Sequence, residues 1–473
     1  MTPRKIASFA LGPIGGAALG FITLPLITWF FSQEDVGRMS MLNVAISFSV
    51  LLYTLGLDQA YVREFHESEN TPALLKTTLL PGLILLTLSL GVLFSFDNII
   101  SKWLFEIDSF ILSLMVAVVV ASNFVVRFLS LILRMNEQGL AYSISQILPR
   151  VLLIIIIGGY VLFSAQKNIQ NLILANIIAM LSVCLIYSWS TRQEWLAALS
   201  SKIDYNYLKS LLSYGFPLIF GGLAYWGLTV SDRIFIKELS NFEQLGLYSV
   251  SISFATAATI FQSVFSTIWA PTVYKWAAAN EGLEKIYQVN RYVLLTVIVL
   301  FCLAGLFSWL VTWILPINYN DVRWIVVPCL GFPLLYTLSE TTVVGIGITR
   351  RSNFALLASA VAFIANIIGN YLLIPKYGAA GAAASTCLSF WIFFILRTEF
   401  SIYLWKPQPR FTLYAYTSLI VIGAIINGLF GEQYTYELMA FWLLILASTA
   451  VIFKGEILEG KSWILRKLRA YKF

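Results

Sequence analysis

The sequence predicts an all-α integral membrane protein, and three features carry that prediction. Hydrophobic residues make up 59% of the 473-residue chain and charged residues only 12%, whereas soluble domains carry about 25% charged residues. The mean hydropathy is correspondingly high, at +0.81. Apolar runs long enough to cross the ~30 Å hydrocarbon core of a bilayer recur along most of the chain. This pattern leaves no room for a soluble catalytic domain.

We expect about fourteen transmembrane helices, each formed by one apolar run. The longest polar gaps between runs are about 22 residues, which is too short for an independent domain. The expected spans are 9–31, 39–62, 75–95, 109–133, 143–163, 169–190, 213–236, 245–269, 291–315, 323–347, 353–374, 380–403, 411–430 and 437–453.

The distribution of Lys and Arg predicts the orientation of the spans. With the N-terminus in the cytoplasm, most of the 31 Lys and Arg residues fall in cytoplasmic segments, as the positive-inside rule requires; they include Arg397 near the end of the predicted span 380–403. Both termini are then cytoplasmic, and residues 454–473 form a basic cytoplasmic tail, which we expect to be a topology anchor; a helix lying on an anionic leaflet is the alternative. The formal charge of +7 is mostly a topological signal, so we expect no nucleic-acid partner.

The chain repeats itself. The first span contains GPIGGAALG and the seventh contains YGFPLIFGG, and the segments that follow them, FFSQEDVGRMS and ELSNFEQLGLYS, are also similar. An even number of spans separates the copies, so both enter the membrane in the same direction. This pattern predicts two parallel six-helix lobes related by a pseudo-twofold axis along the membrane normal. The predicted lobes are residues 1–200 and 201–405, followed by two further helices in residues 406–453.

Glycine and proline occur at corresponding places in the two copies. Paired interruptions of this kind indicate bendable helices that let one lobe move against the other during transport. Close helix packing is the alternative, since small residues allow two backbones to approach. The candidate hinge or gate residues are Gly15, Gly16, Pro25, Pro217, Gly221 and Gly222.

Arginines inside predicted spans are the strongest candidates for a functional site. A guanidinium at the centre of a membrane helix costs ~2.5–3.5 kcal/mol on insertion scales, so it persists where it meets a partner, a cavity or a ligand. Asn123, Arg127 and Arg134 share one face of the fourth span, and Arg150 lies in the fifth. Polar stripes on other spans predict a water-accessible cavity. We expect these four residues to bind an anionic substrate, because guanidinium groups grip phosphate oxygens in bidentate fashion.

Acidic residues in or near the spans offer another role for Arg127. In that alternative, Arg127 forms a structural ion pair with Asp58 or Glu340, or extends to the cytoplasmic surface. Asp58 and Glu340 are also candidates for coupling to H⁺ or Na⁺, because a poorly hydrated carboxylate takes up a cation readily. Asp232 lies beside Arg233 at the outer end of the seventh span, where we expect a local pair or a gate contact.

No cofactor or metal site is expected. The four cysteines lie in predicted spans without CxxC spacing, and His66 is the only histidine. No GxxxxGK[ST] sequence is present, which argues against ATP hydrolysis by a P-loop. The predicted outer loops are too short for the acceptor site of a membrane glycan polymerase and hold no carboxylates at acid–base spacing. We therefore expect a protein that is not an enzyme.

The chain resembles the polysaccharide repeat-unit flippases, the O-antigen (Wzx-type) translocases of the multidrug, oligosaccharidyl-lipid and polysaccharide exporter superfamily. The resemblance rests on the two-lobe plan and on the segments ITLPLITWFFSQEDVGRMSMLNVAISF, YGFPL, SDRIFIKELSNFEQLGLYSVSISF and PKYGAAGAAAST. It implies a protein of the bacterial inner membrane that moves undecaprenyl-diphosphate-linked oligosaccharides from the cytoplasmic to the periplasmic leaflet by alternating access.

The resemblance also implies partners and a cavity. The partners would be the polyprenyl-diphosphate-linked oligosaccharide, membrane lipids and the polysaccharide polymerase machinery. In such proteins the first, second, fourth, seventh, eighth and tenth spans line the cavity; these include Arg127 and Glu340, whereas Arg150 on the fifth span departs from the pattern. A multidrug exporter and a lipid II flippase of the same superfamily stay open, although the arginines favour an anionic, lipid-linked substrate over a drug.

Overall fold

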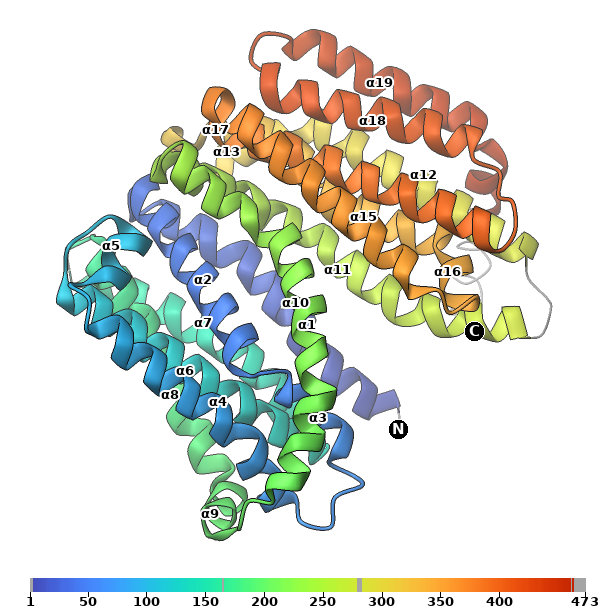
Figure 1. Ribbon diagram of the computed structural model, residues 1–473. Helices are drawn as coiled ribbons and strands as arrows, with labels where there is room; N and C mark the ends of the chain where they lie inside the picture. The colour runs from blue at the N-terminus through green and yellow to red at the C-terminus, as the bar shows by residue number, and fades with distance from the viewer. Residues whose placement is uncertain (1–2, 164–165, 279–282, 461, 463–473) are drawn as a thin grey trace, which may run out of the picture. The chain divides into compact units, whose positions relative to one another are not determined.

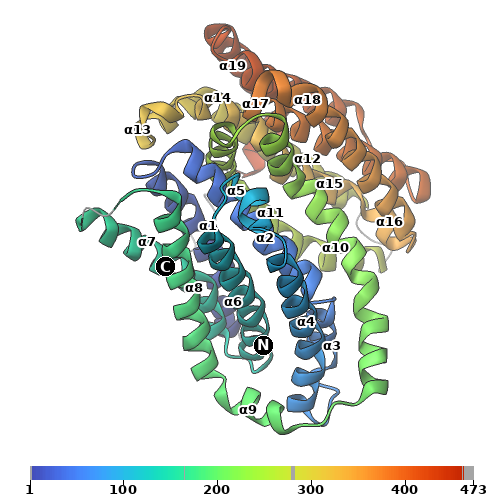
Figure 2. The same ribbon diagram turned by 60° about the vertical axis from the view of Figure 1, so that its left-hand side comes forward.

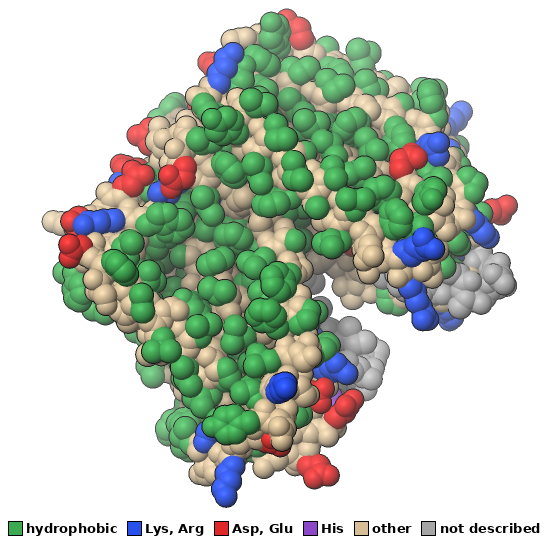
Figure 3. All heavy atoms as spheres, viewed as in Figure 1, with side chains coloured by type: hydrophobic (Ala, Val, Ile, Leu, Met, Phe, Trp, Pro, Cys, Tyr) green, Lys and Arg blue, Asp and Glu red, His purple; other side chains and the backbone are tan. Residues whose placement is uncertain are grey.

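The computed structural model describes residues 3–163, 166–278, 283–460 and 462, and these residues form helices and short connections with no strand (Figures 1 and 2). Twelve helices within these ranges are long and apolar enough to cross a membrane. Hydrophobic side chains cover the sides of the helices in Figure 3, whereas Lys, Arg, Asp and Glu gather near helix ends. The predicted all-α, multi-pass membrane fold is confirmed.

The chain divides into two compact units by its internal contacts, Met1–Ile234 and Phe235–Phe473, which we call unit 1 and unit 2. The boundary falls inside helix α10 (Tyr205–Leu239), so most of this helix belongs to unit 1. The lobes predicted from the repeat meet instead at residue 200. That division by sequence similarity stays a prediction, because a contact-based division follows packing and does not test it.

Unit 1 is a bundle in which α1 packs on α7, α6 packs on α8, and α2 packs on α6. Two short helices, α5 and α9, lie at opposite ends of the unit (Figures 1 and 2). Besides most of α10, its described helices are α1 (Pro3–Thr28), α2 (Gln33–Tyr53), α3 (Leu57–Glu64), α4 (Thr71–Phe94), α5 (Ile99–Phe105), α6 (Phe110–Met135), α7 (Gly139–Leu162), α8 (Ile169–Ser190) and α9 (Arg192–Ser200).

Unit 2 repeats part of this packing, with α11 against α14 and α15, α15 against α17, and α12 against α19. Residues 454–460 continue as helix after α19. The other described elements are α11 (Phe242–Ala278), α12 (Leu283–Phe307), η1 (Ser308–Leu310), α13 (Val311–Ile314), η2 (Ile317–Tyr319), α14 (Val322–Cys329), α15 (Gly331–Thr342), α16 (Val344–Ile348), α17 (Ser352–Leu404), α18 (Phe411–Phe430) and α19 (Thr435–Ile452).

The starts of α2 and α11 show the repeat at the level of hydrogen bonds. The Ser32 hydroxyl oxygen accepts a hydrogen bond of 3.1 Å from the backbone N–H of Asp35 and thereby caps α2. At the equivalent position of the second copy, the Asn241 amide oxygen accepts from the backbone N–H of Gln244 at 2.9 Å. Each cap satisfies a backbone donor that the first helical turn leaves without a partner.

The second predicted span, 39–62, is broken in the structure. α2 ends at Tyr53, and α3 begins at Leu57. Between them, Leu55 and Gly56 adopt left-handed backbone conformations, with φ of 52° and 69°. Hydropathy does not reveal this break, because Leu55 and Leu57 on either side of Gly56 are both apolar. It changes the direction of the chain just before Asp58.

Two neighbouring predicted spans, 353–374 and 380–403, form one helix, α17, with a bend in place of a loop. Gly378 has φ 50° and ψ −125° at the bend, and Pro375 lies just before it. The backbone N–H of Ala379, freed by the bend, donates to the side-chain oxygen of Gln244 at 3.0 Å. The helix therefore changes direction without leaving a buried donor unpaired.

The predicted number of spans differs from the number of apolar helices found. α17 counts once although it covers two predicted spans, and the apolar part counted for α1, Gly15–Thr28, is shorter than a full crossing. The count of fourteen and the cytoplasmic position of the termini stay predictions. Most of the predicted basic tail, 454–473, lies outside the described residues.

Candidate functional site

The α2–α3 break places a carboxylate inside unit 1. Asp58 lies in the first turn of α3, directly after the left-handed Gly56, and the residue is only 6% exposed. The N-terminus of a helix carries a partial positive charge from its unsatisfied N–H groups, which stabilises an anion there. Gly56 is required at this turn, because a Cβ on it would lie 2.1 Å from the carbonyl oxygen of Gly215 in α10.

Arg127 of α6 forms an ion pair with Asp58. Its Nε and Nη2 atoms donate to Oδ2 of Asp58 at 3.1 and 2.6 Å. The Gln59 side chain donates to the same oxygen at 3.1 Å. Asp58 is therefore one of the two partners that the sequence offered for this arginine. The pair lies within unit 1 and explains how α6 accepts a charge in an apolar run.

The ion pair with Asp58 does not occupy all the N–H donors of the Arg127 guanidinium. The Arg127 side chain is 35% exposed, whereas that of Asp58 is 9% exposed. Within the part of the chain that the structure describes, Nη1 of Arg127 donates no hydrogen bond. A guanidinium presents five N–H donors in a planar fork, so donors remain for an anion that approaches from the accessible side.

The other two candidates on α6 differ in setting. The Asn123 amide donates to the backbone oxygen of Val119 at 2.9 Å, one turn earlier on the same helix. Arg134 is exposed in the last turn of α6, where a cation interacts favourably with the helix C-terminus. The structure thus places Asn123 beside Arg127 and Arg134 at the helix end.

Arg150 lies against the glycine-rich face of α1. A Cβ added to Gly16 or Gly20 would come 3.3 or 3.2 Å from its Nη1 atom. Among the described residues, no acidic side chain forms an ion pair with Arg150, and the residue is exposed. Arg150 therefore offers an accessible positive charge beside the backbone of α1. Whether it binds substrate stays a prediction.

The glycines of α1 are explained by packing. A Cβ on Gly15 would lie 2.7 Å from the Ile147 side chain of α7. The backbone N–H of Gly12 donates to the Ser143 hydroxyl at 2.9 Å. Small residues at this spacing let α1 approach α7 closely, which was the alternative to a hinge. Pro25 lies further along α1, and the hinge role stays a prediction.

The equivalent glycines of α10 have different surroundings. A Cβ on Gly222 would meet the Leu51 side chain of α2 at 2.6 Å, whereas one on Gly221 would find no atom within 4 Å. Pro217 lies inside the same helix. The paired sequence positions therefore do not have paired contacts, and Gly221 is the one of these glycines that packing does not explain.

Glu340 lies in unit 2 with an arginine that the sequence analysis assigned to the cytoplasm. Arg397 of α17 is half-buried; it donates from Nη1 to the Ser339 hydroxyl at 2.7 Å, and its guanidinium lies 4.8 Å from the Phe393 ring centre. The Tyr336 hydroxyl interacts with both Glu340 and Arg397. Sequence reasoning missed Arg397 because it stands near a span end, although Phe393 precedes it by one helical turn.

The last candidate acid, Asp232, is only 1% exposed near the end of α10 in unit 1. Its role as a gate or pairing residue stays a prediction. No group of three or more His, Cys, Asp or Glu is placed to hold a metal ion among the described residues. The four cysteines are free.

A comparison with protein families identifies the relatives of this chain. A family described as "Polysaccharide biosynthesis protein" matches residues 3–276, more than half of the chain. The chain belongs to this polysaccharide biosynthesis family. A curated relative, the probable low-salt glycan biosynthesis flippase Agl15 of Haloferax volcanii, is 20% identical over 402 residues, 84% of this chain and 83% of that protein. The capsular polysaccharide biosynthesis protein CapF of Staphylococcus aureus is 23% identical over 268 residues, 54% of this chain and 65% of CapF.

Solved structures show the fold of this polysaccharide biosynthesis protein. The lipid II flippase MurJ in an inward closed conformation is similar with a TM-score of 0.66 and 15% identity, over 95% of this chain and 99% of MurJ. An inward-facing multidrug resistance MATE transporter of the MOP superfamily has a TM-score of 0.55 and 13% identity, over 85% of this chain and 96% of the transporter. The predicted family resemblance is confirmed, and the fold is the one that MurJ and this MATE transporter share.

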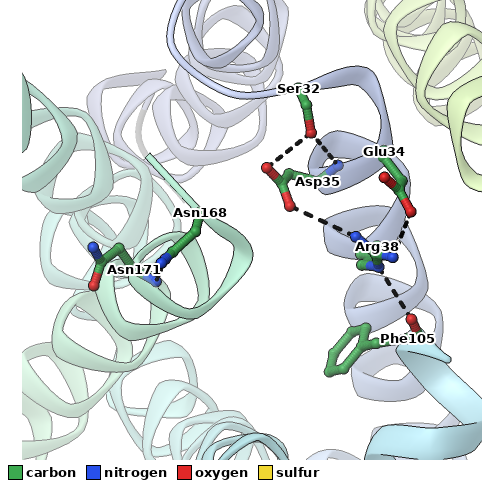
Figure 4. Close-up of polar contacts among 7 residues, drawn as sticks. All are labelled: Ser32, Glu34, Asp35, Arg38, Phe105, Asn168 and Asn171. Carbon is green, nitrogen blue, oxygen red and sulfur yellow. Dashed lines mark hydrogen bonds and ion pairs between the residues drawn. The ribbon is translucent and has the colours of Figure 1, made fainter. Parts of the chain in front are cut away.

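The start of α2 in this family member is held by polar contacts that fix a neighbouring helix. Arg38 donates from Nε to the backbone oxygen of Phe105 at the end of α5, at 3.0 Å (Figure 4). Glu34 and Asp35 flank the guanidinium of Arg38 from the same turn of α2. α5 is thereby tied to α2 at one end of unit 1.

Proposed function

We propose that this protein is a flippase that moves undecaprenyl-diphosphate-linked oligosaccharide repeat units, as of O-antigen or a related surface polysaccharide, from the cytoplasmic to the periplasmic leaflet. The observation that carries the proposal is the state of the two arginines in unit 1. Arg127 keeps accessible donors beside a single carboxylate, and Arg150 is exposed without an acidic partner among the described residues. Two accessible guanidinium groups between apolar helices suit a diphosphate attached to a lipid.

In this proposal, Asp58 is the resident counter-ion of Arg127. Without substrate, the carboxylate neutralises the guanidinium and removes most of the cost of placing it in the membrane. A diphosphate brings more negative charge than one carboxylate, and it competes for the same donors. Asn123 would hydrogen-bond the first sugar or the phosphate, and Arg134 would attract the head group at the helix end. Binding and release would then follow the competition between substrate and Asp58.

Translocation would use alternating access, with bending of α1 and α10 at their Gly and Pro residues. Gly221 is the best-supported flexible position, since no atom lies where its side chain would be. Asp58 and Glu340 are the candidates for coupling to H⁺ or Na⁺. Protonation of Asp58 would break its ion pair with Arg127 and free the guanidinium for substrate. A proton gradient would thereby be coupled to substrate binding.

A lipid II flippase is the second candidate, because lipid II also carries a polyprenyl diphosphate and the fold is similar to that of MurJ. A multidrug exporter is less well supported, since drugs of that class do not require two arginines. We also propose that the chain is not an enzyme, resides in the bacterial inner membrane, and works beside the polysaccharide polymerase machinery. The names of the glycan-biosynthesis relatives support the polysaccharide substrate over lipid II.

The test is complementation of a bacterial strain that lacks its own O-unit flippase. Wild type, Arg127→Ala, Arg127→Lys and Arg150→Ala are compared at matched membrane levels, with Gly158→Ala of α7 as a control for substitution in an open position. We expect both alanine variants to lose surface polysaccharide and to accumulate lipid-linked units, and Arg127→Lys to recover part of the activity because it keeps the charge.

Full activity of both alanine variants would make the arginines structural and contradict the assignment. Rescue of a strain that lacks lipid II transport, without rescue of the O-unit strain, would support the second candidate instead. An in vitro assay with a defined undecaprenyl-diphosphate sugar in proteoliposomes removes the dependence on the glycan of one strain.

A further inference from the structure

An apolar groove of about 520 Å³ runs through unit 1 between α2, α4, α5, α6 and α10. Its walls include Ala45 and Phe48 of α2, Leu90 of α4, Trp103 of α5 and Val120 of α6. The volume lies in the range of ligand-binding sites, about 300–1,000 Å³. The contact between Arg38 and the end of α5 fixes the helix that forms one end of this groove, so the groove is built into the fold (Figure 4).

The apolar lining of the groove favours a hydrocarbon ligand over a sugar or a phosphate. Ser49 and the hydroxyl of Tyr53 are its main polar groups, and the other walls are aliphatic or aromatic. A sugar or phosphate placed there would lose its hydration without gaining hydrogen bonds, which costs several kcal/mol for each unpaired polar group. In a chain that spans a membrane, the hydrocarbon that can enter is a lipid chain.

The groove and the arginine site lie along one face of α6. Val116 and Val120 line the groove, and Asn123 and Arg127 follow at positions that continue the same helical face. Val120 and Arg127 are separated by about 10 Å along the helix, at 1.5 Å per residue. Tyr53, which also lines the groove, ends the helix just before the break that positions Asp58. A lipid whose anionic group meets Arg127 can therefore place the adjoining chain in the groove.

The other end of the groove carries a weaker cation. Lys102 of α5 pairs with Asp108 at 3.1 Å, and Asn98 donates to Asp108 at 2.7 Å. Both side chains of the Lys102–Asp108 pair are largely exposed, so water screens the charge of Lys102. A guanidinium in an apolar run, as at Arg127, binds a phosphate more strongly than a hydrated ammonium does. The arrangement therefore favours a lipid held from the Arg127 end, and an anionic phospholipid held at Lys102 is the competing occupant.

We infer that the groove holds the first isoprene units of a polyprenyl chain whose diphosphate is bound at Arg127. This inference rests on the proposed function, because it takes the polyprenyl diphosphate as the substrate. Trp226 of α10 closes the wall beside α2, where its indole N–H donates to the Ser47 hydroxyl at 3.0 Å and its ring lies 5.2 Å from that of Phe48. The groove thus binds the chain through shape and apolar contact, while Arg127 binds the charge.

The test is photolabelling of the purified full-length protein in phosphatidylethanolamine and phosphatidylglycerol nanodiscs. The probe is undecaprenyl diphosphate with a photoreactive diazirine close to the phosphate end of the chain. Adducts are mapped by mass spectrometry of peptides. We expect labelling of residues 44–53, residues 90–93 and Trp226, and competition by unlabelled undecaprenyl phosphate at a concentration at least tenfold below that of phosphatidylglycerol.

Two variants of α4 provide a matched comparison. Leu90→Trp fills the groove, whereas Leu88→Trp adds the same side chain at an exposed position outside it. We expect Leu90→Trp to reduce labelling of the groove about tenfold and Leu88→Trp to leave it unchanged. Ala45→Leu fills the groove from α2 and serves if Leu90→Trp does not yield a monodisperse protein. Equal labelling of the filled and control variants would overturn the inference.

Further outcomes of the labelling experiment separate this inference from the proposed function. Labelling outside the groove, or equally effective competition by phosphatidylglycerol, overturns the groove assignment even when the protein translocates repeat units. Specific groove labelling in a protein that does not translocate an undecaprenyl-diphosphate sugar in proteoliposomes supports the groove and contradicts the proposed repeat-unit substrate. Absence of any specific labelling overturns the inference whatever the outcome of complementation.

Discussion

Replacement of Asp58 by Asn tests the ion pair on which the candidate site depends. The change removes the negative charge but keeps the size of the side chain. Arg127 then remains in an apolar bundle without its counter-ion, and we expect the folded state to lose stability. The variant also exposes the guanidinium to any competing anion, so its affinity for undecaprenyl phosphate should rise.

The size of the stability loss follows from the contacts. Two hydrogen bonds, at 3.1 and 2.6 Å, join Arg127 to one oxygen of Asp58. Hydrogen bonds to charged groups contribute about 1.5–3 kcal/mol each when they are buried. Arg127 is 35% exposed, so water screens part of the interaction, and the asparagine oxygen still accepts one hydrogen bond. We therefore expect Asp58→Asn to cost about 1–2 kcal/mol in all.

A double-mutant cycle measures the interaction directly. Asp58→Asn, Arg127→Met and the double variant are unfolded with denaturant in mixed micelles, and the free energies of unfolding are compared. The double variant should be at least about 1 kcal/mol more stable than the sum of the single losses predicts, because neither charge is then left alone. A coupling energy within error of zero would refute the ion pair as a stabilising contact. If the double variant recovers stability but not transport, Arg127 has a role beyond the pair.

Three further substitutions or conditions test other parts of the fold. Gly56→Ala should lower the free energy of unfolding by about 2–4 kcal/mol, because Gly56 has a left-handed backbone and its Cβ would clash with a carbonyl oxygen of α10. Gly221→Ala should change the free energy of unfolding little. Thermal unfolding in detergent compares the two variants. Gly378→Ala should lower stability by about 2 kcal/mol in the same assay, since its φ is 50° and its Cβ would meet a glutamine of α11. Burial raises the pKa of Glu456, but the hydrogen bond from Arg291, a backbone hydrogen bond and the charge of Arg291 together hold the pKa below the ordinary 4.5. The stabilisation from this pair is therefore present above pH 4.5 and is lost as the pH falls through the lower folded-state pKa. Protection of residues 454–460 from hydrogen exchange, corrected for the intrinsic rate at each pH, should fall only below pH 4.5.

The sequence predicted much of the candidate site as a set of residues but not as a set of contacts. Arg127 and Asp58 were both candidates because a charge in an apolar run is costly wherever it lies. Their pairing could not be chosen over Arg127 with Glu340, because the choice depends on two left-handed residues, Leu55 and Gly56, that redirect the chain before Asp58. Spacing along one helix carries no information about a bend in another.

Arg397 and the glycines of α1 also show that local sequence does not determine tertiary contacts. Arg397 was counted as a cytoplasmic charge because of its position near a span end, yet its guanidinium lies against the rings of Phe393 and Tyr336. The local sequence does not distinguish an arginine that stacks on aromatic rings from one that is exposed to water. Gly15 and Gly16 were candidates for bending or for packing, and only the position of α7 shows how closely these glycines are packed.

The sequence by itself determined that the chain is helical, spans a membrane many times, and contains two related copies. Those properties follow from hydrophobic content, run length and repetition, which are local and need no partner. Tertiary structure decided which acid neutralises Arg127, where α17 bends, and which faces of α2, α4 and α6 enclose an apolar groove. These features depend on a few backbone angles and on helices distant in sequence meeting side by side, so they exist only once the chain has packed.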